Sequence, residues 1–325
     1  MKSFKKLILI FAIMLATMLS GCGDNTTKQD DKQSTSSLES TSDSNKDNGK
    51  VLDREGNEIV LPEKTDKIIS LAPSITETLI NLGLTDNLVA VDKYSIKVEG
   101  VNKDLPIFDI MNPDAENIVS IQPDIIFGTG MSKSKGTDPF SPMVEMGAFV
   151  TVVPTSTSID GIKEDILYIG KVTKKEEEAK KIVSEYDEKI NSILKEIESL
   201  KIDEPISVYF ETSPMPEAYT FGKDTFLNDM LNLLGAKNIF DDQEGWLPVS
   251  EEQVVAKNPS VIITNADYIE NVTEEIKNRA GWENIDAVKN DRVYVIEQNT
   301  SARANENSIQ AFENIAKALY PELQK

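Results

Sequence analysis

The stretch that decides the fold is residues 173–201, TKKEEEAKKIVSEYDEKINSILKEIESLK. Its apolar side chains recur at steps of three, four or one residue, the pattern of a helix that buries one face. Lys and Glu fill the opposite face, and neither Pro nor Gly interrupts the run. At about 1.5 Å per residue the helix is expected to be roughly 40 Å long, more than the width of a small domain. The apolar stripe consists of Ala179, Ile182, Val183, Tyr186, Ile190, Ile193, Leu194, Ile197 and Leu200.

The segments on either side of this helix alternate short apolar runs with helical patterns. Such alternation predicts an α/β unit with a central, mainly parallel sheet. We therefore predict two Rossmann-like lobes, 51–172 and 202–325, joined by a single long helix over 173–201, with a ligand cleft between them. A long surface helix of one domain is the alternative. Strands are expected at 58–61, 67–71, 88–91, 124–127, 149–153, 206–210, 261–264 and 292–296. Helices are expected at 75–82, 115–121, 159–172, 225–234, 251–257, 272–279 and 308–319.

The N-terminus has the layout of a secretory signal peptide, expected over residues 1–21. Three lysines precede an apolar run at 7–19, and Leu-Ser-Gly-Cys closes it at Cys22. That tetrapeptide resembles the bacterial lipobox, whose Cys receives lipid and becomes the new N-terminus. An ordinary signal peptide with an incidental Cys is the alternative. Residues 22–50 are rich in Ser, Thr, Asp, Asn and Lys, and predict a disordered tether.

Composition excludes several classes of function. The formal net charge is −21, which argues against nucleic acid and an anionic bilayer surface as partners and favours a basic docking surface. The chain has no His and a single Cys. This excludes Ser-His-Asp catalysis, His-based zinc sites, thiol metal sites and an intrachain disulfide, and we expect no metal site.

One internal echo points to two related lobes. The segments 114–127 and 250–263 have the same features in the same order, at a constant offset of 136 positions. Each has a capping residue, a helix, a Pro that stops the helix and an apolar strand. A second echo places Glu77 six residues before Gly83 and Asp229 six before Gly235. Any succession of a helix and a strand can produce one such similarity by chance. The two similarities together favour duplication of one lobe.

From about residue 67 to 322 the chain resembles the substrate-binding proteins of bacterial ABC importers, in particular those that capture iron–siderophore complexes or vitamin B12. No single motif is specific, but their order and spacing are. The motifs are ISLAPSITE at 69–77, QPDII at 122–126, GAKNIF at 235–240, WLPVSEEQVVAKNP at 246–259, AVKNDRVY at 287–294 and AKALYPE at 316–322.

The resemblance implies a lipid-anchored, extracytoplasmic binding protein that is a monomer without cofactor and not an enzyme. It would deliver a metal chelate, an iron–siderophore or a corrinoid, to a permease dimer with its cytoplasmic ATPase. In that family two Glu residues, one on each lobe, meet Arg pockets of the permease, and the matching positions are Glu116 and Glu252. A Glu in the first turn of a helix is also favoured by the helix dipole alone. Glu77 and Asp229 are further candidates for the same acidic rim.

The resemblance also implies a cleft lined by aromatic side chains, which offer large apolar faces to a bulky chelate. Arg303 is expected to hydrogen-bond a polar group of the ligand. The aromatic candidates for the cleft are Tyr94, Phe108, Tyr219 and Trp246. Each of these four residues, taken alone, is more often a core residue than a binding residue.

The chain departs from the family at several positions, and two rival classes stay open. Gly128-Thr129-Gly130 stands where a second cleft Trp is expected, and four Arg in the whole chain argue against a cradle for a highly anionic catecholate. A secreted lipoprotein hydrolase would need two carboxylates facing each other across the cleft. An extracytoplasmic scaffold or adhesin would have no enclosed pocket.

Overall fold

The computed structural model describes residues 51–133, 140–202 and 204–324. The chain divides into two units, Met1–Asn48 and Gly49–Lys325, and only the second is considered below. The predicted signal peptide, the tether and Cys22 therefore lie outside the described residues. In the part of the chain that the structure covers, no helix has the length and apolar character needed to cross a membrane.

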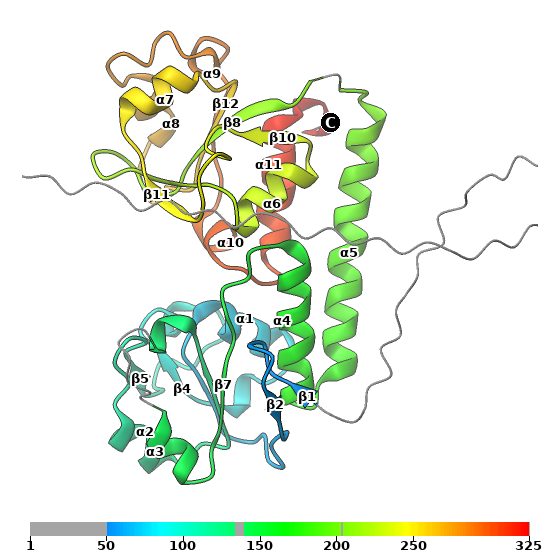
Figure 1. The fold of residues 1–325 in the computed structure, drawn as a ribbon, viewed down its shortest axis with the longest axis vertical. Coiled ribbons are helices and arrows are strands. Elements are labelled where there is room, and N and C mark those ends of the chain that lie inside the picture. The colour runs from blue at the N-terminus through cyan, green and yellow to red at the C-terminus, as the bar shows by residue number, and fades with distance from the viewer. Residues whose placement is uncertain (1–50, 134–139, 203, 325) are drawn as a thin grey trace, which may run out of the picture. The chain divides into compact units, whose positions relative to one another are not determined.

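The N-terminal lobe, from β1 to α4, is built on a five-stranded sheet in which every neighbouring pair is parallel (Figure 1). The central strands are buried on both faces, as expected when helices cover a parallel sheet. In spatial order the strands are β5 (Ile107–Phe108), β4 (Leu88–Asp92), β3 (Ile68–Ser70), β6 (Ile125–Gly128) and β7 (Phe149–Val152). The helices are α1 (Pro73–Asn81), η1 (Thr85–Asn87), η2 (Ser95–Lys97), α2 (Ala115–Ile121), η3 (Gly130–Lys133), α3 (Ser141–Glu145) and α4 (Ile159–Val172).

A small antiparallel hairpin, β1 (Val51–Leu52) with β2 (Glu58–Ile59), precedes the sheet. Arg54 in its turn attaches the hairpin to α4. Its Nε donates to Asp165 at 2.5 Å, and its Nη1 donates to Glu164 at 2.6 Å. The hairpin is thus held to the lobe by these ion pairs together with Ile59 of β2, which packs against the apolar core.

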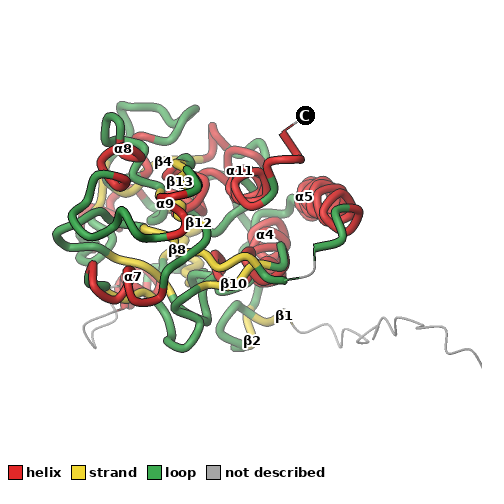
Figure 2. Tube along the Cα trace, turned by 90° about the horizontal axis from the view of Figure 1, so that it is seen from above, coloured by secondary structure: helices red, strands yellow, loops and turns green. Residues whose placement is uncertain are grey.

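The long helix is α5 (Glu176–Ser199), and it runs back along α4 as the second arm of a helical hairpin (Figure 1). The predicted interval 173–201 includes the turn between the two helices, where Lys174 has a φ of 58°. Ala179, Tyr186 and Ile190 of the predicted stripe are buried. Figure 2, seen from above, shows α4, α5 and α11 side by side along one side of the sheets.

The C-terminal lobe, from β8 to η4, contains a four-stranded parallel sheet and a separate antiparallel ribbon, β9 (Tyr219–Phe221) with β11 (Trp246–Pro248). The sheet strands in order are β10 (Ala236–Asn238), β8 (Ile206–Glu211), β12 (Val261–Thr264) and β13 (Val293–Val295). The helices are α6 (Phe226–Leu233), α7 (Glu251–Lys257), α8 (Val272–Lys277), α9 (Asp286–Lys289), α10 (Gln298–Ala302), α11 (Ser308–Leu319) and η4 (Pro321–Gln324).

The two lobes share one local architecture. Four strands of the first sheet, β4-β3-β6-β7, follow the same order as β10-β8-β12-β13 in the second. The side chains of Asp114 and Ser250 cap α2 and α7, and both helices end on a left-handed residue, Gln122 (φ 53°) and Asn258 (φ 44°). A strand follows each helix at the predicted offset of 136 positions, β6 from residue 125 and β12 from residue 261. The predicted fold, two parallel-sheet lobes linked by a long helix, is confirmed.

The apolar core is partly separate and partly shared. The faces of the two sheets away from α5 have their own clusters, around Ile126 in the N-terminal lobe and around Trp282 in the C-terminal lobe. The opposite faces belong to one cluster that continues through α4, α5 and α11. The long helix is therefore a packing layer for both lobes as well as the connection between them.

Candidate functional site

A cavity of about 320 Å³ has walls from both lobes. From the N-terminal lobe it is lined by residues that follow the carboxyl ends of strands: Ala72 after β3, Tyr94 after β4, Thr129 after β6 and Val153 after β7. The C-terminal lobe contributes α10 and the loop that leads to α11. Ligands of open parallel sheets bind at the carboxyl ends of the strands, so the cavity is the candidate ligand site.

Tyr94 is the predicted aromatic residue that lines this cavity, and its side chain is half-exposed. The fully buried Asp92 fixes the turn before it. Asp92 accepts hydrogen bonds from the backbone N of Tyr94 at 2.7 Å and of Ser95 at 3.2 Å, and also from the Ser95 hydroxyl. Tyr94 is therefore presented by a rigid turn at the end of β4.

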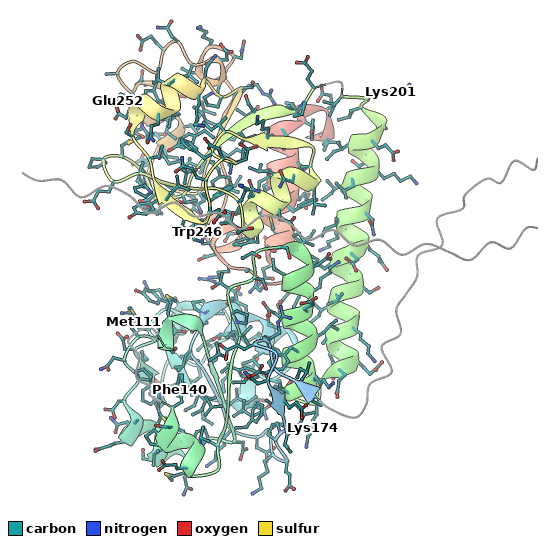
Figure 3. All side chains as sticks on the ribbon, viewed as in Figure 1. Met111, Phe140, Lys174, Lys201, Trp246 and Glu252 are labelled. Atoms are coloured by element: carbon teal, nitrogen blue, oxygen red, sulfur yellow. The ribbon has the colours of Figure 1, made fainter. Side chains whose placement is uncertain are left out.

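Trp246 and Tyr219 lie on the β9–β11 ribbon, where they are 48% and 44% exposed. The Trp246 ring meets Phe221 edge-on at 5.8 Å between centroids, which leaves much of the indole uncovered. Figure 3 shows Trp246 on the side of the C-terminal lobe toward the N-terminal lobe. Neither aromatic is among the residues that line the 320 Å³ cavity.

Phe108, the fourth predicted aromatic, is buried in the core of the N-terminal lobe. It belongs to the same cluster as Ile69, Ile118 and Ile126, and it does not line the cavity. Its place at the end of the edge strand β5 makes it a packing residue of the sheet.

Arg303 lines the cavity and is tied to both lobes. Its Nη1 donates to Glu77 on α1, and its Nη2 donates to Asn299 on α10 at 2.8 Å. Glu77 also accepts from the side-chain amides of Asn305 at 2.6 Å and Asn307 at 3.3 Å. Glu77 is thus engaged between the lobes and is not on an open acidic rim. Its counterpart in the second echo, Asp229, accepts a hydrogen bond from the backbone N of Ile159 at 2.8 Å.

Glu306 makes the reciprocal contact, which was not predicted from the sequence. This carboxylate from the C-terminal lobe accepts from Thr78 at 2.7 Å and from Asn81 at 2.6 Å, both on α1. Burial raises the pKa of the Glu306 carboxyl, although the hydrogen bonds from Asn81 and Thr78 oppose the shift. We call these contacts, between Glu77 or Glu306 and the other lobe, the interlobe clasp. A polar loop before a helix has no periodicity, so no sequence pattern marks it.

The charged side chains among the described lining residues are Asp165 and Arg303, and each has a counter-ion. Asp165 pairs with Arg54 and accepts a hydrogen bond from Ser156, while Arg303 pairs with Glu77. Burial raises the pKa of Asp165 against these two partners. The described part of the cavity wall therefore lacks the pair of facing carboxylates that a glycosidase-type hydrolase needs.

Glu116 and Glu252 occupy the same place in the two repeated units. Each is exposed in the first turn of its helix, α2 or α7. A hydrogen bond from Ser250 lowers the pKa of Glu252. Both helices lie on the side of the molecule remote from α5 (Figures 1 and 3). The structure thus places the two predicted docking carboxylates in equivalent, solvent-facing positions.

The chain is similar in sequence to one known protein family and to several known binding proteins. Residues 68–300 match the family described as periplasmic binding protein. The uncharacterized ABC transporter substrate-binding lipoprotein YvrC of Bacillus subtilis (strain 168) is 33% identical over 318 residues, 96% of each chain. The vitamin B12-binding protein of Yersinia pestis (strain Pestoides F) is 28% identical over 221 residues, 66% of this chain and 76% of that one.

A solved structure extends the similarity to three dimensions. A possible iron-binding (periplasmic solute-binding) protein from Staphylococcus epidermidis ATCC 12228 has a TM-score of 0.69 and 32% identity, over 79% of this chain and 100% of that chain. All three are named as binding proteins, one of them as the substrate-binding lipoprotein of an ABC transporter, which agrees with the prediction of a binding protein rather than an enzyme. With its two parallel-sheet lobes, its single connecting helix and a family match over most of its length, the chain belongs to the periplasmic binding protein family.

Proposed function

We propose that this protein is the substrate-binding component of an ABC importer on the extracytoplasmic face of the cell membrane. The observation that carries the proposal is the cavity with walls from both lobes at the carboxyl ends of parallel strands. The relation to YvrC over 96% of both chains supports the transport role. The partners of such a protein are a permease dimer and its cytoplasmic ATPase.

The anchor in this proposal is a lipid on Cys22 after removal of residues 1–21. Residues 22–50 then form the tether, and 51–172 and 202–325 form the lobes that the 173–201 segment connects. The tether lets a monomeric binding protein sample the volume above the membrane while it stays near the permease.

The ligand in this proposal is a metal chelate, an iron–siderophore or a corrinoid. Two relatives support this class: one is named a vitamin B12-binding protein and the other a possible iron-binding protein. Tyr94 and Arg303 line the cavity, and Trp246 and Tyr219 add half-exposed aromatic surface on the C-terminal lobe. A cavity of about 320 Å³ is at the small end of the usual range of about 300–1,000 Å³. The cavity would therefore enclose only part of a bulky chelate.

Titration of the purified protein tests this proposal. Cyanocobalamin, cobinamide and a ferric hydroxamate are added separately, and binding is followed by tryptophan fluorescence and by calorimetry. Trp246 is half-exposed whereas Trp282 is buried. A ligand at the edge of the C-terminal lobe is therefore expected to quench mainly the fluorescence of Trp246. Saturable one-to-one binding of one of these chelates supports the proposal. If none of them binds, the ligand is neither a corrinoid nor a ferric hydroxamate, and other metal chelates or small solutes are to be tested.

A further inference from the structure

In the described wall of the ligand cavity, the positive and negative charges are already paired within the protein. Arg303 is the cation among its described lining residues, and the Glu77 carboxylate from the opposite lobe neutralises it. Asp165 is the anion, and Arg54 neutralises it at 2.5 Å. The other polar lining groups are hydroxyls and amides, such as Ser74, Gln298 and Asn299.

Glu77 is held in this role by more than one contact. Its side chain is 13% exposed, and that of Arg303 is 19% exposed, so the pair is largely withdrawn from water. The second carboxylate oxygen is fixed by Asn305 and Asn307, which belong to the same loop as Arg303. Because the two opposite charges are in contact, their fields largely cancel in the cavity, and the low exposure of the pair keeps salt from screening their attraction.

From these contacts we infer that Glu77 determines the charge of the chelate that this protein accepts. With Glu77 in place, the cavity offers neutral hydrogen-bonding groups and apolar surface, and it takes an uncharged metal chelate. An anionic chelate would enter a cavity whose described wall has no unpaired cation, close to the carboxylates of Glu77 and Asp165. It would lose its hydration without gaining a counter-ion from that wall. This inference rests on the proposed function, because it concerns the ligand of the same cavity.

Two kinds of uncharged chelate fit this description, and the experiment separates them. The probes are ferrichrome, an uncharged ferric trihydroxamate, and cyanocobalamin, an uncharged corrinoid. Ferric enterobactin, a trianionic tricatecholate, is the charged comparison. Affinities are measured with the purified full-length protein and its Glu77→Gln variant. Gln is isosteric with Glu and keeps an oxygen to accept from Asn305, while it removes the charge opposite Arg303.

The wild-type protein is expected to bind one uncharged probe at least about tenfold more tightly than ferric enterobactin. Glu77→Gln is expected to shift this ratio by about tenfold toward ferric enterobactin, which corresponds to about 1.4 kcal/mol. Adding Arg303→Gln to Glu77→Gln removes the freed cation, so the double variant is expected to return to the wild-type preference. The matched control is Glu313→Gln, which removes the same charge from an exposed pair with Lys317 on α11 and leaves the ratio unchanged.

Thermal unfolding of each variant shows whether it is folded before affinities are compared. If Glu77→Gln unfolds, Arg303→Gln alone still tests the inference, because the loss of a neutralised cation is expected to leave the preference for the uncharged probe in place. A wild-type protein that binds ferric enterobactin as tightly as the uncharged probes overturns the inference. So does a folded Glu77→Gln variant with the wild-type ratio. Failure of the wild-type protein to bind any of the three probes overturns the proposed ligand class as well.

Discussion

Gly170 in α4 and Ala179 in α5 approach so closely that a Cβ on Gly170 would lie 2.4 Å from the Cβ of Ala179. The same Cβ would lie 3.0 Å from the carbonyl oxygen of Lys175, in the turn between the helices. Neither neighbour is the end of a flexible side chain that can move aside. The helical hairpin that connects the lobes therefore depends on the absence of a side chain at residue 170.

Gly170→Ala is expected to destabilise the protein by about 1–3 kcal/mol, the usual cost of overpacking a close contact. The better helix propensity of Ala recovers only part of this loss. Chemical denaturation measures the difference. Gly130→Ala is the control, because a Cβ there meets no atom within 4 Å. Equal stability of Gly170→Ala and the wild-type protein would show that the two helices separate easily.

Charge reversal of both proposed docking residues, Glu116→Lys with Glu252→Lys, is expected to abolish ligand uptake in cells and leave ligand affinity unchanged. Both carboxylates are exposed and neither lines the cavity, so charge reversal is expected to affect only the proposed contact with the permease. Uptake of radiolabelled ligand and titration of the purified protein are the two measurements. Glu188→Lys with Glu196→Lys, on the exposed side of α5, is the control for net charge. A loss of affinity in the first variant would assign Glu116 or Glu252 to ligand binding instead.

Two of the predicted aromatics are expected to respond differently to substitution. Trp246→Ala removes a half-exposed ring at the lobe edge, so ligand affinity is expected to fall about tenfold with little change in stability. Phe108→Leu changes a buried core residue, so stability is expected to fall by about 1 kcal/mol with unchanged affinity. Calorimetric titration and thermal unfolding of both variants give the comparison. The opposite pattern would exchange the roles of these two residues.

The interlobe clasp is expected to make stability depend on pH through Glu306. Its raised pKa means that the folded protein keeps this proton at pH values where the unfolded chain has released it. The contribution of Glu306 to stability is therefore full below the ordinary glutamate pKa and is lost as the pH rises through the raised value. Glu306→Gln lacks this titration, so the stability of the wild-type protein relative to the variant is expected to be greater at pH 5 than at pH 8. Thermal unfolding at both pH values is the test, and a difference that grows toward pH 8 would contradict the assignment.

Arg279 is expected to be essential for the C-terminal lobe. It donates to the fully buried Glu211 through Nη1 at 2.6 Å and Nη2 at 3.0 Å. Arg279→Met leaves Glu211 without its counter-ion, which is expected to cost about 3–5 kcal/mol. Lys277→Met, at the end of α8 and two residues before Arg279, removes surface pairs with Glu274 and Asp291 and is expected to cost less than about 1 kcal/mol. Denaturant unfolding of both variants measures the difference, and similar costs would mean that water reaches Glu211.

Much of the fold was predictable because its signals are local. The helices α2, α4, α7 and α11 have the predicted bounds, since each combines a periodic apolar face with a clear stop. The ribbon β9–β11 was not predicted as strands, because three residues are too few to show alternation. The short edge strands β5 and β10 were missed for the same reason.

The candidate site was less predictable. Tyr94 and Arg303 line the cavity, whereas Phe108, chosen on the same chemical grounds, lies in the core. An aromatic residue at the end of a strand packs inward or lines a cavity according to its position in the sheet, and β5 is an edge strand. The residues next to Phe108 in the sequence do not show whether its strand lies at the edge or in the centre of the sheet.

The sequence by itself determined the two parallel-sheet lobes, the long helix between them, the repeated helix–strand units and the absence of His and paired Cys. These follow from periodicity, capping residues and composition, which act over a few residues at a time. Only the tertiary structure decided that Glu77 neutralises Arg303, 226 positions away, and that Glu306 reaches back to α1. Such pairs form when folding brings two loops together, because a charge selects its partner by distance in space and not by spacing along the chain.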